Sequence, residues 1–205
     1  MAVGDFLSDL ELQLDECDAL RLHALSDISD PSTRALIYES VLLRAARSHE
    51  NFVEGVFLSY LLGEPTEAGG TVRAFAAPID RDHARKLISV SAGPRFIDWS
   101  DAETVRARSS VFFEPDSPLY VAASTKSSEL AWIKKVRNQA AHDSVESRLS
   151  YNTVVGHLLV VEPNPIPSAG DFLQMAPSSG PVKGREVLAF FLDALREFAR
   201  TGAGA

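Results

Sequence analysis

The chain has 205 residues, of which 45% are hydrophobic and 23% charged, with a net charge of −8 at pH 7. Length and composition suit a single soluble globular domain with a sizeable core. No apolar run approaches the roughly 18 residues of a membrane span, and the first residues lack the pattern of a signal peptide. Cys17 is the only cysteine, which excludes internal disulfides and cysteine-based zinc sites. We therefore expect a cytoplasmic protein with no membrane association, metal or cofactor.

The charge is unevenly distributed along the chain. Residues 1–67 carry −9, residues 68–148 carry +2 and residues 149–205 carry −1. The overall acidity argues against broad, non-specific binding of nucleic-acid duplexes. A local basic pocket that grips one or two phosphates is compatible with the middle segment.

Apolar residues at a period near 3.6 predict a first helix over residues 5–27 and a long second helix from about 33 to 62. Gly63 and Pro65 follow it in the usual order of stop residues. Further helices are predicted over residues 81–90, 98–112 and 127–142. Short apolar runs at 157–161 and 171–175, separated by proline and glycine, favour a small β-hairpin within 155–180. A last helix is predicted over 184–201. The expected fold is a mainly α, up-and-down helical bundle, forming one domain over residues 1–205 with the hairpin before the C-terminal helix.

The most informative segment is the sequence RNQAAH, residues 137–142, which we call the RNQAAH motif. Asn138 and His142 are four residues apart and share one helical face, and Arg137 flanks that face. A guanidinium grips phosphate oxygens, and an imidazole exchanges a proton near neutral pH. Lys134 and Lys135 precede the motif and either guide RNA towards it or serve as solubilising charge.

The segment 133–144, with Arg137-Asn138 followed by His142, resembles the signature of the HEPN superfamily. Residues 49–55 (HENFVEG) are similar to the W-E-x-F-x-E stretch of the RiboL-PSP type, with His49 where tryptophan is commoner. The likeness covers roughly residues 33–200. It implies a helical bundle that dimerises, so that two motif helices form one composite ribonuclease site.

The resemblance also assigns roles to residues. Arg137 and His142 correspond to the catalytic pair, and Asn138 to the polar residue that orients phosphate or water. Glu50 and Glu54 correspond to acidic supporting positions. The leading hypothesis is a metal-independent endoribonuclease that cleaves RNA through 2′-OH attack as a homodimer. The resemblance implies a toxin, phage-defence or stress effector, with a cognate antitoxin or nucleotidyltransferase as partner.

Several alternatives remain open. The chain can be a non-catalytic HEPN-like scaffold that binds RNA, nucleotide or protein. Arg137 and His142 can simply cap the end of their helix, where its dipole favours basic side chains. Glu50 and Glu54 can form a solvated stripe that pairs with Arg47. The sequence lacks the clustered ligands that a metal-dependent hydrolase needs. For His83 we expect a solvated position at the start of a helix. We expect the imidazole of His49 to be partly buried, with its hydrogen bonds satisfied.

Overall fold

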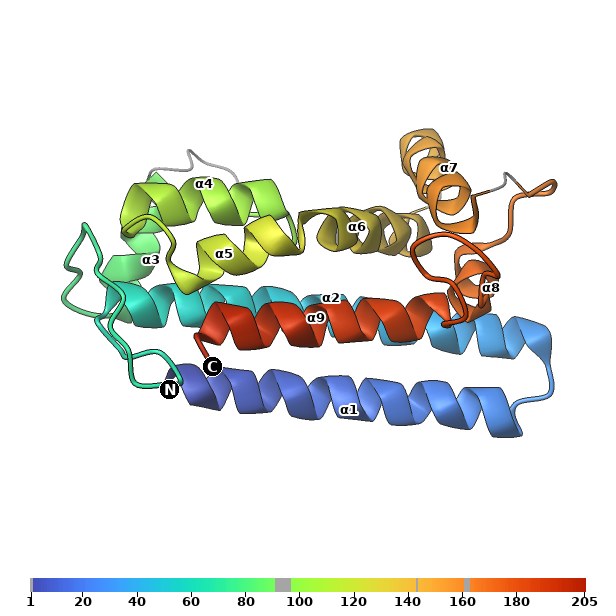
Figure 1. Ribbon diagram of the computed structural model, residues 1–205, viewed down its shortest axis with the longest axis horizontal. Coiled ribbons are helices and arrows are strands. Elements are labelled where there is room, and N and C mark those ends of the chain that lie inside the picture. The colour runs from blue at the N-terminus through green and yellow to red at the C-terminus, as the bar shows by residue number, and fades with distance from the viewer. Residues whose placement is uncertain (1, 91–96, 143, 161–162) are drawn as a thin grey trace. The chain divides into compact units, whose positions relative to one another are not determined.

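The computed structural model describes residues 2–90, 97–142, 144–160 and 163–205. These residues form nine helices and no β-strand (Figure 1), which confirms the mainly α-helical class. No helix among them is long and apolar enough to cross a membrane. The helices are α1 (Val3–Asp27), α2 (Pro31–Leu61), α3 (Arg81–Val90), α4 (Ala102–Phe112), α5 (Pro118–Thr125), α6 (Ser127–Ala141), α7 (Val145–Leu159), α8 (Ala169–Gln174) and α9 (Val187–Ala203).

Local sequence signals account for several helix ends. Gly63 follows α2 with a φ of 78°, a left-handed conformation that glycine adopts without steric cost. Asp101 caps α4 by accepting a hydrogen bond from the Thr104 N–H at 3.0 Å, so this helix begins later than the predicted residue 98. The sequence patterns do not predict α5, which starts with Pro118 in its first turn, where a missing N–H costs nothing.

The predicted β-hairpin over residues 155–180 is wrong. The described residues of this stretch contain the end of α7 and the whole of α8. Ser144 starts α7 through a capping box with Ser147, and Ser168 starts α8 by accepting the Asp171 N–H at 3.1 Å. A short apolar run suits a buried helix face as well as a strand, and here the caps favour the helix.

Contacts between residues divide the chain into two compact units. Unit 1 comprises Met1–Leu12, Ser48–Leu130 and Leu195–Ala205, and unit 2 comprises Gln13–Arg47 and Ala131–Ala194. The boundaries fall inside α1, α2, α6 and α9. The expectation of one domain over residues 1–205 stays a prediction.

Unit 1 has an aromatic core at the C-terminal end of α2. The ring of Phe57 packs against Trp99 and Phe113, with centroids 5.1 and 4.8 Å away. Tyr60, one turn further along, donates its hydroxyl to the Gly202 carbonyl at 2.8 Å. The start of α1 and the end of α9 both belong to this unit, so both termini of the chain lie in it (Figure 1).

Unit 2 contains the first part of α2, most of α6, and all of α7 and α8. The Gly170 N–H at the start of α8 donates to the Glu39 carboxylate of α2 at 2.9 Å. Tyr151 of α7 donates its hydroxyl towards the Pro167 carbonyl at 3.0 Å, and its ring meets Phe172 edge-on at 5.7 Å. These contacts hold α7 and the segment before α8 together.

Candidate functional site

The predicted catalytic side chains lie at the C-terminal end of α6, in unit 2. Arg137 and Asn138 occupy the last turns of the helix, and His142 follows its final residue, Ala141. The His142 N–H still donates to the Asn138 carbonyl at 2.9 Å. Helical geometry therefore extends through the motif and keeps Asn138 and His142 on one face. Arg137 and Asn138 are half-buried, whereas His142 is exposed.

The Arg137 guanidinium is oriented by its neighbour in the chain. Its Nη1 donates to the Asn138 side-chain oxygen at 3.1 Å. A guanidinium carries five N–H donors in a fixed fork, a geometry that suits phosphate oxygens. Asn138 thus contacts the arginine directly.

The start of α7 holds the backbone of His142 in place. The Ser147 hydroxyl lies 2.6 Å from the His142 carbonyl and 3.1 Å from the Gln139 side-chain oxygen. Ser147 also belongs to the capping box of α7, in which Ser144 accepts the Ser147 N–H at 3.1 Å. The exposed imidazole therefore projects from a backbone that two helix ends restrain.

The structure brings together only some of the predicted site residues. Lys134 and Lys135 lie on α6 in unit 2 with the RNQAAH motif, and both are half-buried. Glu50 and Glu54 lie on the part of α2 that belongs to unit 1. A supporting role for the two glutamates stays a prediction.

The contacts of Glu54 suit the alternative of a solvated stripe. Its carboxylate accepts a hydrogen bond from Nε of Arg85, on α3, at 3.1 Å. The two side chains are 36% and 53% exposed. An ion pair this accessible to water contributes little to stability and needs no functional explanation.

His49 is more deeply buried than the sequence predicts. Its residue is 2% exposed, and its ring lies edge-on to Phe198 with centroids 4.7 Å apart. Its Nε2 atom has no hydrogen-bond partner among the described residues. Burial lowers the pKa of this imidazole to about 4, because the charged form loses its hydration. His49 is thus a neutral core residue within unit 1.

The metal alternative finds no support in the arrangement of histidines. The His83 N–H donates to the Asp80 carboxylate at 2.8 Å, and the His83 Nδ1 accepts the Ile79 N–H at 3.3 Å. These contacts belong to the start of α3, as expected. In the part of the chain that the structure describes, no group of three or more histidine, cysteine or acidic residues is placed to hold a metal ion.

A buried charge cluster in unit 2 is absent from the sequence predictions. Arg21 of α1 donates to Asp18 at 2.8 Å and to Glu186, just before α9, at 3.0 Å. Burial lowers the pKa of Arg21, but the hydrogen bond to Asp18 and the charge of Glu186 outweigh it and raise that pKa. Burial together with the Glu186 charge raises the pKa of Tyr38 to about 12. Since Arg21 and Glu186 are 165 residues apart, no local pattern indicates this pair.

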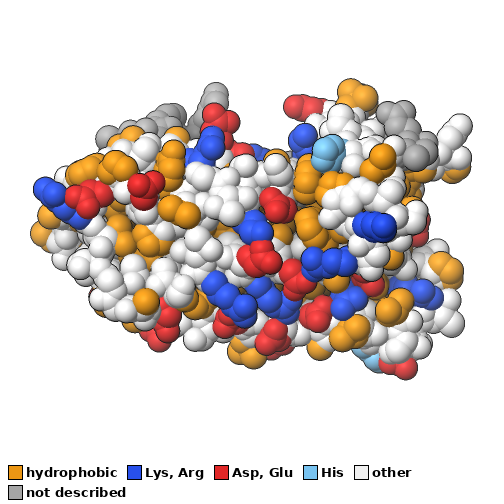
Figure 2. Space-filling view, viewed as in Figure 1, with side chains coloured by type: hydrophobic (Ala, Val, Ile, Leu, Met, Phe, Trp, Pro, Cys, Tyr) orange, Lys and Arg blue, Asp and Glu red, His pale blue; other side chains and the backbone are white. Residues whose placement is uncertain are grey.

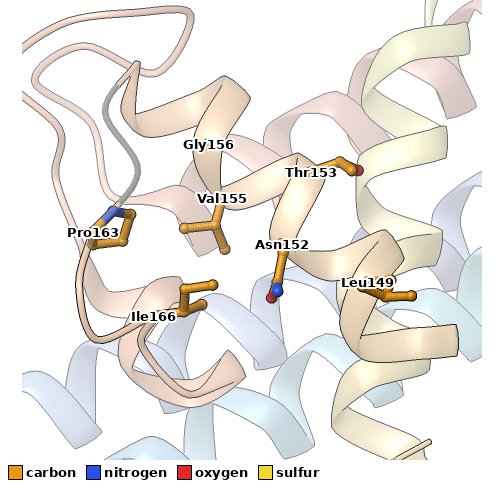
Figure 3. Close-up of a pocket in the computed structure, with 7 residues that line it drawn as sticks. All are labelled: Leu149, Asn152, Thr153, Val155, Gly156, Pro163 and Ile166. Carbon is orange, nitrogen blue, oxygen red and sulfur yellow. The ribbon is translucent and has the colours of Figure 1, made fainter. Parts of the chain in front are cut away.

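A cavity in unit 2 is also absent from the predictions. It has a volume of about 260 Å³ and lies between α7 and the segment that leads to α8 (Figure 3). Its one amide side chain is that of Asn152, seven residues after the first residue of α7. Its walls come from α7 and from residues 163–166, and no short sequence pattern indicates how these two segments pack.

Charges of both signs are mixed on one face of the molecule. On the face shown in Figure 2, lysine and arginine side chains lie among aspartate and glutamate side chains, with no broad basic area. An interspersed surface of this kind offers no long electrostatic track for a duplex. On this face, a nucleic acid would have to be gripped locally.

Comparison with protein-family models, curated proteins and solved structures finds no match to this chain. The resemblance to the HEPN superfamily therefore rests on residues 49–55 and 133–144 alone.

Proposed function

We propose that this protein is a metal-independent endoribonuclease of the HEPN kind, with an up-and-down helical bundle fold. The observation that carries the proposal is the arrangement at the end of α6. There Arg137, held by Asn138, lies five residues before the exposed imidazole of His142. A cation and an accessible acid–base group on one helix end are two of the groups needed to cleave a phosphodiester without a metal.

The chemistry follows from these groups. Arg137 binds the scissile phosphate and stabilises the charge that develops on its non-bridging oxygens. His142 takes the proton from the ribose 2′-OH, which attacks the phosphorus, or delivers a proton to the departing 5′-oxygen. The products are a 2′,3′-cyclic phosphate and a 5′-hydroxyl. DNA lacks the 2′-OH and is not cleaved.

The acid and base roles call for a second copy of the chain. One RNQAAH motif supplies one imidazole, and that group cannot accept and donate a proton in the same step. A homodimer with facing motifs supplies both, with Lys134 and Lys135 guiding RNA towards the cleft. We further propose a cytoplasmic toxin or defence effector controlled by a cognate antitoxin or nucleotidyltransferase.

One observation favours a second candidate, a non-catalytic scaffold that binds RNA, nucleotide or protein. Residues 1–67 carry a net charge of −9, which suits docking of a basic partner better than attraction of RNA. A scaffold has no chemical need for Arg137 and His142, so their replacement distinguishes the two functions.

The test compares the wild-type protein with Arg137→Ala and His142→Ala on single-stranded RNA in excess chelator. Matched controls are Arg73→Ala and His23→Ala, which alter exposed side chains elsewhere. We expect each motif variant to lose about a hundredfold or more in cleavage rate, and both controls to keep it. The products should end in a cyclic phosphate, and a substrate with a single 2′-deoxy residue should resist cleavage there. Absence of cleavage by the wild-type protein, with RNA binding intact, would favour the scaffold.

A further inference from the structure

Aromatic rings from three helices of unit 2 meet one another. The ring of Trp132 on α6 and the imidazole of His157 on α7 have centroids 5.2 Å apart and planes tilted by 39°. The Trp132 ring also lies 6.4 Å from the ring of Phe190 on α9, with a tilt of 36°. We call Trp132, His157 and Phe190 the ring cluster, and all three belong to unit 2.

The ring cluster differs from the ring contacts of unit 1 in its access to solvent. The ring contacts described in unit 1 join buried side chains, such as Phe57 and Trp99, which are 0% and 4% exposed. In the ring cluster the imidazole is exposed and the two other rings are half-buried. Packing within the chain therefore leaves part of each ring accessible. Adjoining rings that reach the surface are typical of an interaction site.

Cationic side chains adjoin the ring cluster. Lys135 follows Trp132 by three residues on α6, and side chains at this spacing are neighbours on a helix surface. The guanidinium of Arg185 lies over the Phe190 ring, 5.5 Å from its centroid, and also pairs with Asp193. Aromatic rings beside cations bind single-stranded nucleic acids, because bases stack on the rings while the cations attract the phosphates.

The ring cluster and the RNQAAH motif lie along the same helix. Lys135, Asn138 and His142 follow one another at spacings of three and four residues, which places them on one face of α6. The ten residues from Trp132 to His142 span about 15 Å of helix, a distance that a short stretch of RNA bridges. A strand that binds Arg137 through one phosphate therefore reaches the ring cluster with a nearby base.

We infer that the ring cluster binds single-stranded RNA by stacking against its unpaired bases, an inference that rests on the proposed ribonuclease function. Every base has an aromatic face, so stacking of this kind holds a strand without reading its sequence. Phosphates next to the stacked base lie against Lys135. The ring cluster thus anchors the strand on the helix that carries Arg137.

The test compares two probes that differ only in their bases, and it measures binding, so that it does not depend on catalysis. One probe is an oligoadenosine with 2′-O-methyl groups throughout, which cannot be cleaved through 2′-OH attack. The other is an abasic oligomer of the same length and backbone. Both are titrated with the full-length protein and followed by fluorescence anisotropy. We expect the wild-type protein to bind the oligoadenosine about ten- to a hundredfold more tightly than the abasic oligomer.

Three variants locate that preference in the ring cluster. Trp132→Ala should weaken binding of the oligoadenosine about five- to a hundredfold and leave binding of the abasic oligomer unchanged, because only a base loses its stacking partner. Lys135→Ala should weaken binding of both probes by the same factor, because it removes a phosphate contact. Phe75→Ala, which removes a 60% exposed ring of unit 1, should keep the wild-type preference. Thermal melting checks that each variant is folded.

Tryptophan fluorescence adds a readout that a purely structural role of Trp132 would leave unchanged. The chain has two tryptophans, and the other one, Trp99, is 4% exposed and belongs to unit 1. The oligoadenosine should therefore change the emission of the wild-type protein and leave that of Trp132→Phe unchanged. Trp132→Phe should nevertheless keep most of the affinity, because phenylalanine retains a ring on which a base stacks.

The outcomes separate this inference from the proposed function. Three results overturn the ring cluster as a base-binding surface even if RNA is cleaved: equal or absent binding of the two probes by the wild-type protein, a preference that folded Trp132→Ala keeps, or a wild-type emission that the oligoadenosine leaves unchanged. A preference that Trp132→Ala abolishes, together with the change in emission, supports the surface even if no RNA is cleaved. In that case only the ribonuclease proposal fails.

Discussion

Acidification from about pH 7 to about pH 5 should destabilise the protein through the single buried histidine His49. Its ring is enclosed in unit 1 against Phe198, and burial lowers its pKa to about 4 from an ordinary value of 6.5. In the folded protein the imidazole therefore stays neutral at mildly acidic pH. In the unfolded chain it becomes charged and solvated, and the unfolded state is favoured.

The magnitude follows from these two pKa values. Between about pH 6.5 and about pH 4 the unfolded state binds more protons, so stability falls as the pH falls through this window. At about pH 5 the unfolded imidazole is almost fully protonated and the folded one is not, which lowers the free energy of unfolding by about 2 kcal/mol. Near pH 7 the same effect is about 0.2 kcal/mol.

The assay is urea-induced unfolding at the two pH values, for wild type, His49→Leu and His142→Ala. Leucine keeps the site apolar and of similar volume but cannot titrate. The loss of stability on acidification should therefore be smaller by about 2 kcal/mol in His49→Leu than in wild type. The exposed His142 serves as the matched control, and its replacement should leave the wild-type dependence in place.

A wild-type protein and a His49→Leu variant that lose the same stability on acidification would refute this reasoning. Such a result would mean that His49 reaches water or finds a proton acceptor in the folded state.

Two further predictions concern packing and buried charge in unit 2. Gly170→Ala should lower the free energy of unfolding by about 1–3 kcal/mol, because an added Cβ would lie 2.4 Å from the Ala35 carbonyl oxygen. Thermal melting measures the loss. A second substitution, Ala35→Gly, should not restore the stability, since the backbone oxygen remains. Glu186→Ala should cost about 3 kcal/mol, because the enclosed Arg21 loses one of its two carboxylate partners. Glu186→Gln, which keeps a hydrogen-bond acceptor of the same size, should lower the free energy of unfolding by less, as measured by urea-induced unfolding. Equal stability of wild type, Glu186→Ala and Glu186→Gln would show that the Arg21–Glu186 pair is solvated.

The sequence indicated the helices whose signals are local. The period of apolar residues in α1 and α2 and the stop residues after Leu61 place those elements within about two residues, because each helix bonds to itself. The arrangement of Asn138 and His142 follows in the same way from a spacing of four residues. The prediction of strands at 157–161 and 171–175 is wrong, because burial alone does not distinguish a strand from a helix and Ser144 and Ser168 cap helices here.

Local sequence patterns therefore specify a mainly helical chain in which one helix end carries an arginine and a histidine. Only the packing of distant segments shows that His49 is enclosed and that Arg21 meets Glu186. These features depend on residues far apart in the chain. Helical hydrogen bonds form within a few residues and leave a local pattern, whereas burial and pairing depend on which distant segments pack together, which no short stretch of sequence encodes.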